Sequence, residues 1–437
     1  MSTRRTTQIF CASTLYGAVT IAAALDSGCF GTADRRILLV TNNAAVPETT
    51  PPLDEAEGFD RLRGRFDSVL SWNETISPLH PGGWTPRPSD LPLLQRHLRK
   101  LWDLGDDRVE LALESPQVTP ALAIAQLLPD APITVYADGL MSYGPTRNKI
   151  DPLIGGRVGR LLHLDLVPGL APLLLAEFGA VAETVPTEAF TKVVEELTGP
   201  AAAEDGPALL LGQYLAALNL LTAAEEEELH LRMVRGAIAL GHRRLVFKPH
   251  PTAPDAWSRT LVREAADLGA ELTVEDRPVL AEVLYGELRP ALVVGCFSTA
   301  LLTARTFYGL PVARVGTGTL LERLTPFQNS NRIPLTVVDA VVPPLEDGES
   351  AAAEIGTDQL NDLVAAVGFA MQPKIRPELR EPAVRHLSGP LAERTRHHFT
   401  RRRLTVLNLP GGIPLPRHPQ VRRLARRALR LRRALKR

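Results

Sequence analysis

Three short segments carry side chains that could act on a phosphate or a hydroxyl group, and each follows an apolar run typical of a buried strand. Asp138 and Gly139 follow residues 133–136, Lys248 and His250 follow residues 245–247, and Ser298 and Thr299 follow residues 291–294. In open α/β sheets, ligands bind at the carboxyl ends of the strands. Their positions therefore favour a common binding site over three unrelated turns.

The segment at residues 248–251 holds its histidine between two prolines. Each proline fixes its own φ and biases the residue before it toward an extended conformation. The imidazole of His250 could donate a hydrogen bond to a departing phosphate, and Lys248 would add positive charge. A rigid surface turn with a solvated histidine is the structural alternative, and His-Pro pairs also occur at residues 80–81 and 418–419.

The other two segments also have a functional and a structural interpretation. The Asp138 carboxylate could serve as a general base toward a hydroxyl, with Gly139 free to adopt a positive φ, or the pair could form an ordinary Asp-Gly turn. Ser298 and Thr299 begin an expected helix, where free backbone N–H groups bind phosphate. A serine at that position is also a common helix cap.

The elements that would position these segments alternate between strand and helix. The strands expected in the first half lie at residues 8–12, 37–40, 68–70, 109–113, 133–136 and 161–164, and those in the second half at 208–211, 245–247, 272–274, 291–294, 312–315 and 333–338. Helical patterns lie between many of them, for example at residues 16–27, 91–104, 120–128 and 298–308. This alternation predicts parallel sheets covered by helices on both faces.

A chain of 437 residues is too long for one ordinary core, and a small, turn-forming segment divides it. We expect two doubly wound, Rossmann-like α/β domains that face each other across a cleft. The expected limits are an N-terminal domain at residues 1–198 that carries the base, a linker at 199–207, a nucleotide-sugar-binding domain at 208–380, a helical or extended segment at 381–416 and a basic amphipathic tail at 417–437.

The charge distribution and the cysteine content indicate where in the cell the protein is expected. The tail at residues 417–437 holds ten basic residues and no acid, which leaves 39 basic against 49 acidic residues in the rest of the chain. Its basic residues alternate with apolar ones at helical spacing, which favours an anionic membrane surface, while the lack of interleaved aromatic residues disfavours nucleic acid. Three cysteines in apolar settings predict reduced thiols in a cytoplasmic protein.

The order Asp-Gly, Lys-Pro-His-Pro, Ser-Thr resembles that of bacterial sialyltransferases with a GT-B fold, and most closely the capsule-type polysialyltransferases. Four segments look like those of members of the same family: residues 113–117, 138–144, 211–213 and 294–299. The resemblance implies an inverting enzyme that transfers sialic acid from CMP-sialic acid to a glycan hydroxyl, in the synthesis of polysialic acid or a capsule-like glycan. It also implies a cytoplasmic protein peripheral to the inner membrane face.

The resemblance assigns roles to single residues. Asp138 would be the base, and His250 would stabilise the departing phosphate. The donor-binding residues would be Gly139, Gln213, Lys248, Pro251, Ser298 and Thr299. Ala137 stands where the family has a second acid, so Glu114 is the expected partner that tunes the pKa of Asp138. We expect no cofactor and no metal, because a CMP sugar has one phosphate and no Asp-x-Asp pair offers itself.

Two other functions remain open at this point. The chain could be a GT-B glycosyltransferase that uses another CMP-nonulosonate or a UDP sugar. It could also be a non-catalytic protein that binds a nucleotide or a glycan at the membrane. The sequence does not identify the acceptor, the linkage or the number of sugars transferred.

Overall fold

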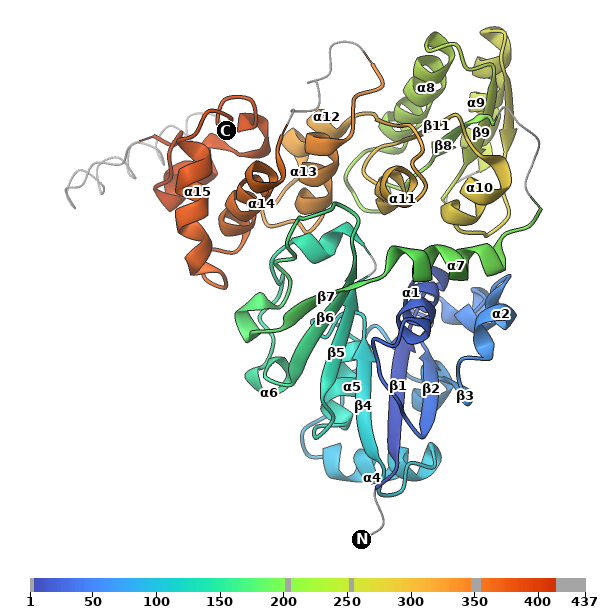
Figure 1. Ribbon diagram of the computed structural model, residues 1–437, viewed down its shortest axis with the longest axis vertical. Helices are drawn as coiled ribbons and strands as arrows, with labels where there is room; N and C mark the ends of the chain where they lie inside the picture. The colour runs from blue at the N-terminus through green and yellow to red at the C-terminus, as the bar shows by residue number, and fades with distance from the viewer. Residues whose placement is uncertain (1–3, 138, 201–205, 251–254, 347–354, 414–437) are drawn as a thin grey trace, which may run out of the picture.

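The computed structural model describes residues 4–137, 139–200, 206–250, 255–346 and 355–413. Figure 1 shows one α/β domain at the N-terminal end of the molecule and a second one above it. The linker at 201–205 and the basic tail lie outside the described residues, so membrane attachment through the tail stays a prediction. In the part of the chain that is described, no helix is both long and apolar enough to span a bilayer.

The first domain contains a seven-stranded parallel sheet in the order β3-β2-β1-β4-β5-β6-β7. The strands are β1 (Thr6–Ala12), β2 (Arg35–Val40), β3 (Ser68–Ser71), β4 (Arg108–Leu113), β5 (Ile133–Ala137), β6 (Val158–Leu164) and β7 (Val181–Val185). The helices are α1 (Leu15–Asp26), α2 (Phe59–Arg63), α3 (Trp72–Ile76), α4 (Leu91–Leu101), α5 (Ala121–Leu127), α6 (Pro152–Gly155) and α7 (Thr187–Leu197).

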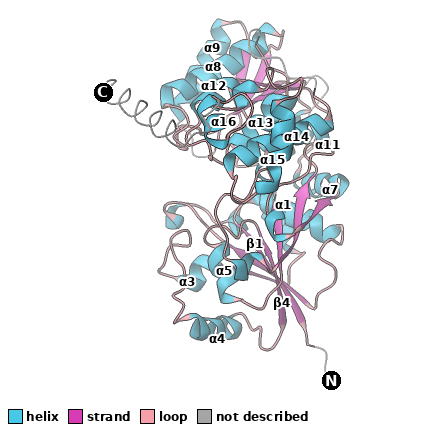
Figure 2. Ribbon diagram, turned by 90° about the vertical axis from the view of Figure 1, so that its left-hand side faces the viewer, coloured by secondary structure: helices cyan, strands magenta, loops and turns pink. Residues whose placement is uncertain are grey.

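Helices cover both faces of this sheet because its inner strands are apolar on both sides. Phe10 of β1 packs in the same core as α1 and α7, whereas its neighbour Ile9 packs in the core with α3, α4 and α5. Figure 2 shows these two helical layers on opposite sides of the strands. The N-terminus of α1 is fixed by Thr14, whose side chain accepts a hydrogen bond from the Gly17 N–H at 3.0 Å.

The second domain contains a five-stranded parallel sheet in the order β10-β9-β8-β11-β12. The strands are β8 (Ala208–Leu211), β9 (Arg244–Lys248), β10 (Glu271–Val274), β11 (Leu292–Gly295) and β12 (Val312–Arg314). The helices are α8 (Ala223–Ala239), α9 (Asp255–Asp267), α10 (Ala281–Leu288), α11 (Thr299–Phe307), α12 (Thr317–Arg323), α13 (Arg332–Val341), α14 (Thr357–Met371), α15 (Arg380–Leu387) and α16 (Arg401–Leu407).

The last expected strand, at residues 333–338, is wrong: these residues belong to helix α13. Every residue from Arg332 to Ala340 is buried, so the polar stripe of Arg332, Thr336 and Asp339 faces other protein groups rather than solvent. Within residues 333–338 the single polar residue is Thr336, and this short, mostly apolar run does not distinguish a helix from a strand. Pro334 is tolerated because it lies in the first turn, where its missing N–H has no helical partner. Strand β7 was not expected, because it is a largely exposed edge strand without an apolar run.

The C-terminal helices return to the first domain and join the two domains. Asn361 of α14 accepts a hydrogen bond from the Ala171 N–H at 3.0 Å and donates one to the Gly169 carbonyl at 2.9 Å. The rings of Phe190 in α7 and Phe307 in α11 also pack edge to face, with their centroids 5.6 Å apart. Two Rossmann-like domains joined in this way confirm the expected GT-B fold. The exact domain limits stay a prediction.

The three cysteines are free thiols, as expected. Cys11 and Cys296 are buried and Cys29 is half-buried.

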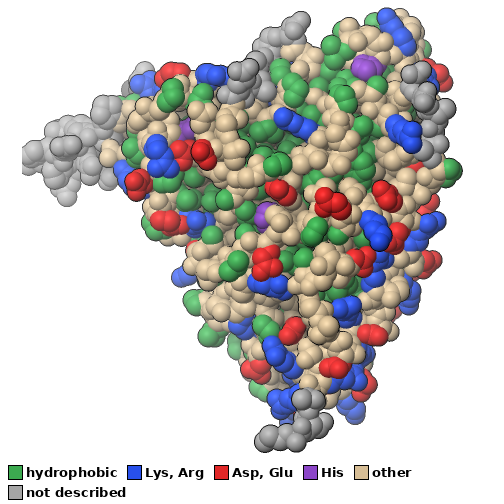
Figure 3. Space-filling model, viewed as in Figure 1, with side chains coloured by type: hydrophobic (Ala, Val, Ile, Leu, Met, Phe, Trp, Pro, Cys, Tyr) green, Lys and Arg blue, Asp and Glu red, His purple; other side chains and the backbone are tan. Residues whose placement is uncertain are grey.

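Figure 3 shows acidic and basic side chains interspersed over the face of the molecule that Figure 1 presents.

Candidate active site

A cavity of about 470 Å³ lies between the carboxyl ends of the two sheets; we call it the transfer cavity. Its wall on the first domain follows β4 and β5, and its wall on the second domain follows β8 and β11. Of the residues singled out from the sequence, Glu114, Gly139, Gln213, Ser298 and Thr299 line it. The structure therefore brings together residues that are up to 185 positions apart, as the strand-end pattern predicted.

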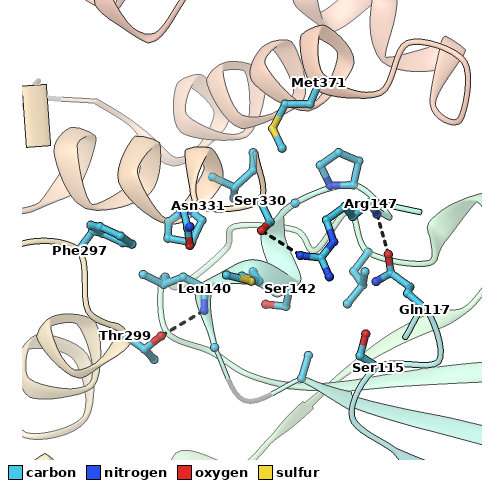
Figure 4. A pocket seen from close by; sticks show the side chains of 18 of the residues that line it. Ser115, Gln117, Leu140, Ser142, Arg147, Phe297, Thr299, Ser330, Asn331 and Met371 are labelled. Atoms are coloured by element: carbon cyan, nitrogen blue, oxygen red, sulfur yellow. Dashed lines mark hydrogen bonds between the residues drawn. The ribbon is translucent and has the colours of Figure 1, made fainter. Parts of the chain in front are cut away.

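Within the transfer cavity, the two domains meet beside Gly139. The Leu140 N–H donates a hydrogen bond to Thr299 Oγ1 at 3.4 Å (Figure 4). The expected positive φ of Gly139 is wrong, because its φ is −141° and its ψ is 178°, an extended conformation. Glycine fits here for another reason: a Cβ atom would lie 3.1 Å from Thr299 Oγ1, tighter than most real contacts.

Asp138 itself lies outside the described residues, and so does Pro251. The residues on both sides of Asp138, Ala137 and Gly139, line the transfer cavity. Its assignment as the base therefore stays a prediction.

Glu114 follows β4, the strand that pairs with β5. Its half-buried carboxylate accepts a hydrogen bond from Ser13 Oγ at 3.2 Å. Burial raises the pKa of Glu114, and the hydrogen bond from Ser13 opposes this rise. A carboxyl group with a raised pKa thus lies at the end of the strand that neighbours β5. Its part in tuning a base stays a prediction.

On the opposite wall, side chains fix the loop that leads into α11. Gln213 Oε1 accepts a hydrogen bond from the Phe297 N–H at 2.8 Å. The Ser298 hydroxyl caps α11 by accepting from the Ala300 N–H at 3.2 Å, so the structural interpretation of this serine is confirmed. Thr299 Oγ1 faces the first domain instead, where it accepts from the Leu140 N–H.

Lys248 and His250 do not line the transfer cavity. The Lys248 ammonium donates a hydrogen bond to the Arg277 carbonyl at 2.6 Å, and burial lowers its pKa. The His250 ring lies 6.2 Å from the ring of Tyr214, the residue after Gln213. Partial burial and the charge of Lys248 lower the pKa of His250, so its imidazole is neutral near pH 7.

Arg147 is a cavity residue that the sequence pattern did not reveal. Among the described residues of the cavity wall it is the single Lys or Arg. Its Nη1 donates to Ser330 Oγ at 3.3 Å, and its N–H donates to Gln117 Oε1 at 2.7 Å (Figure 4). Its carbonyl accepts from Gln372 Nε2 at 2.7 Å. Arg147 lies in a loop, between Thr146 and Asn148, and not directly after a strand. No apolar run therefore precedes it in the sequence.

Glu226 was also missed, because it is one of four consecutive glutamates that read as a solvated helix start. Its buried carboxylate accepts hydrogen bonds from the N–H groups of Leu215 at 2.6 Å and Ala216 at 2.7 Å. Burial raises the pKa of Glu226, and these two hydrogen bonds lower it. Glu226 therefore holds the loop after β8, which carries Gln213 and Tyr214 to the site.

One cluster in the described part of the chain has the ligand types of a metal site: Asp339, His397 and His398. None of the three lines the transfer cavity. The Asp339 carboxylate already accepts from Thr317 Oγ1 at 2.6 Å and lies 2.7 Å from His397 Nε2, and its other close neighbour is the Arg314 guanidinium at 3.3 Å. A buried guanidinium disfavours a cation here, so we interpret the cluster as a link between the C-terminal segment and α13.

The Glu226→Gln substitution tests the support of the Gln213 loop. The amide keeps the size of the side chain but replaces one acceptor with a donor, so one buried N–H loses its partner. We expect the free energy of unfolding to fall by about 1–3 kcal/mol in urea titrations, and amide exchange at Leu215 and Ala216 to accelerate. The neighbouring Glu227→Gln, which has no such contacts, is the control. Equal stability and equal exchange in both variants would remove this role.

Comparisons with known proteins found one matching family model and several similar solved structures. A family model described as alpha-2,8-polysialyltransferase matches residues 8–317. Among solved structures, the chain is similar to MurG from Acinetobacter baumannii, with 13% identity over 90% of this chain and 97% of that chain and a TM-score of 0.39. It is also similar to the GT-B domain of a sialyltransferase from Photobacterium damselae, with 12% identity over 76% of this chain and 96% of that chain and a TM-score of 0.41.

No curated protein matches the chain at the level of sequence. The family model, in contrast, extends across both walls of the transfer cavity, from the β4 and β5 ends to Ser298 and Thr299. It covers more than two thirds of the chain. The chain belongs to the alpha-2,8-polysialyltransferase family.

Proposed function

We propose that the chain is an inverting sialyltransferase that transfers sialic acid from CMP-sialic acid to a glycan hydroxyl, without a metal ion. The family assignment supports a glycosyltransferase, and one observation supports this reaction: a carboxylate side and a phosphate-binding side face each other across one cavity. Glu114 and the neighbours of Asp138 form the first side. The N-terminal end of α11, with Thr299 at its start, forms the second.

The proposed reaction is a direct displacement. The oxygen of the acceptor hydroxyl forms a bond to the anomeric carbon of the sialic acid while Asp138 takes the hydroxyl proton. The bond between that carbon and the phosphate oxygen breaks, and its electron pair leaves with CMP. Backbone N–H groups at the start of α11 and the Thr299 hydroxyl stabilise the phosphate. His250 follows β9, which β8 separates from β11, and it lies outside the transfer cavity; in this proposal its imidazole N–H reaches the same phosphate once the donor is bound.

Arg147 supplies a group that a sialic acid donor requires. Sialic acid carries a carboxylate, and a guanidinium pairs with a carboxylate through two parallel hydrogen bonds. Among the described wall residues Arg147 is the single cation, and Ser330 already orients its guanidinium. We assign the donor carboxylate to Arg147, with Ser330 and Asn331 beside it.

A donor screen tests the reaction. CMP-sialic acid, another CMP-nonulosonate, and UDP- and GDP-sugars are each mixed with glycan acceptors in the presence of EDTA, and nucleotide release is measured. We expect release from CMP-sialic acid, and a loss of about a hundredfold or more in kcat in Asp138→Asn with nearly unchanged CMP binding. Turnover with UDP- or GDP-sugars alone would contradict the proposal, and a fully active Asp138→Asn would remove Asp138 as the base.

The pH dependence tests the part played by Glu114. The Ser13 hydrogen bond stabilises the Glu114 carboxylate, so the Ser13→Ala change should raise the pKa of Glu114 further. If the ionised carboxylate supports the base, activity is lost as the pH falls through that pKa. We therefore expect the acid limb of kcat/KM to move to higher pH in Ser13→Ala. Ser27→Ala, a serine at the C-terminal end of α1, is the control, and identical profiles in both variants would exclude Glu114.

The Arg147→Gln substitution tests the carboxylate contact. A hydrogen bond to a charged group contributes about 1.5–3 kcal/mol, so we expect the KM for CMP-sialic acid to rise by about tenfold or more. Lys149→Gln is the matched control, since Lys149 is exposed two positions further on and does not line the cavity. An unchanged donor KM in Arg147→Gln, with a raised acceptor KM, would move the contact from the donor to the acceptor.

A further inference from the structure

The segment that follows α14 is strongly basic even before the tail begins. Residues 372–413 contain nine Lys and Arg residues against three acidic ones, and residues 1–371 contain 30 against 46. Figure 1 shows α14 and α15 on the side of the second domain that lies away from its sheet. The positive charge of the chain is therefore concentrated in a folded C-terminal segment as well as in the tail.

Helix α16 presents arginine and apolar side chains together on its exposed face. Arg402 and Val406 lie one turn apart on that face, with Arg401 beside them, and all three are exposed. Val406 is 64% exposed. Ile413 is 53% exposed, and its N–H donates to Thr405 Oγ1 of the same face at 2.8 Å. We call Arg401, Arg402, Val406 and Ile413 the α16 patch.

The two arginines of the α16 patch are available to an anionic partner. Other arginines of the segment are already paired: Arg385 with Asp362 at 2.7 Å, and Arg396 with Glu393 at 3.3 Å. In the part of the chain that the structure describes, neither arginine of the patch has an acidic partner. Their guanidinium groups can therefore pair with phosphate groups outside the protein.

Hydrogen bonds hold α16 in place below the patch. The Thr400 hydroxyl caps the helix by accepting from the Arg403 N–H at 3.3 Å. The Arg403 side chain points the other way and donates from Nε to the Ala370 carbonyl of α14 at 2.6 Å. Arg380 of α15 donates to the Leu407 carbonyl at 3.1 Å. The patch is thus formed before a partner binds, which lowers the entropy cost of binding.

The composition of the α16 patch favours a lipid bilayer over a soluble polyanion. A basic surface that binds a polysaccharide or a nucleic acid in water gains nothing from exposed Val406 and Ile413. At an anionic bilayer, however, apolar side chains enter the headgroup region while neighbouring arginines pair with the phosphates. The chain also leaves the patch at Ile413 toward the basic residues 417–437, so both would act on one surface.

We propose that the α16 patch binds an anionic phospholipid surface and holds the transfer cavity close to it. Arg403 Nη2 donates to the Met371 carbonyl at 3.3 Å, and Met371 lines the transfer cavity. One helix, about 10–12 Å across, therefore separates the patch from the cavity wall. This inference assigns a folded surface to membrane binding in addition to the tail, and it does not depend on the identity of the donor.

Sedimentation of the whole chain with vesicles tests the inference. Vesicles of phosphatidylcholine are compared with vesicles that also contain phosphatidylglycerol. We expect binding to require phosphatidylglycerol and to weaken with salt. The double variant Arg401→Glu and Arg402→Glu should lower the partition constant about twentyfold or more. Val406→Asp should lower it about fivefold or more, because a charged group replaces the apolar contact.

The matched controls carry the same changes on the first domain: Arg87→Glu with Arg96→Glu, and Leu153→Asp. Arg87 and Arg96 are exposed, and Leu153 is 81% exposed. Amide hydrogen exchange of the wild-type chain is the second measurement. When anionic vesicles are added, we expect exchange to slow at residues 404–413 and to stay unchanged at residues 91–101 of α4. This measurement needs no variant, so it decides the question even where a substitution lowers stability.

The inference is overturned if the wild-type chain does not prefer vesicles with phosphatidylglycerol, or if the patch variants bind them as tightly as the controls. Unchanged exchange at residues 404–413 would overturn it as well. A soluble anionic polysaccharide is tested in parallel. Patch variants that lose affinity for the polysaccharide alone, with vesicle binding unchanged, would assign the α16 patch to a glycan instead.

Discussion

The close approach between Gly139 and Thr299 sets the dimensions of the site. Two parallel sheets can present ligand-binding groups only at their carboxyl edges, so a site built from both requires the edges to meet. The two edges meet where the extended backbone at Gly139 lies against the start of α11. There the Leu140 N–H donates a hydrogen bond to Thr299 Oγ1. A side chain at position 139 would crowd that contact. The contacts of α14 with the first domain hold the two edges at this spacing.

The cavity divides its groups by domain. Among the described residues, the first domain supplies the carboxyl group of Glu114 and the guanidinium of Arg147, and the second supplies the start of α11 with Thr299. This arrangement suits the proposed displacement. Two charged side chains outside the cavity wall, those of Glu226 and Lys248, stabilise the loops near the site. Glu226 holds the loop of Gln213, and Lys248 is bound to a carbonyl rather than exposed in the cavity.

Much of this site could be predicted from the sequence because its residues follow buried strands. Gly139 and Thr299 were found in this way, whereas Glu114 and Gln213 came from the resemblance to the family; all four line the cavity. Arg147 and Ser330 could not be found, since they lie in loops that meet only after α13 and α14 pack on the first domain. Helix α13 was mistaken for a strand because residues 333–338 contain one polar residue, Thr336, and a short apolar run does not distinguish a buried helix from a strand. Glu226 resembled its solvated neighbours, and only its contacts distinguish it.

The central claim is that the two facing edges perform one displacement on a CMP-linked sialic acid. NMR spectroscopy of the reaction between CMP-sialic acid and a glycan acceptor tests it most directly, because it follows the donor, the product and the anomeric configuration together. The account predicts one sialoside for each CMP released, with the anomeric configuration opposite to that of the donor. A product that retains the donor configuration, or a donor that stays intact with every acceptor, would contradict it.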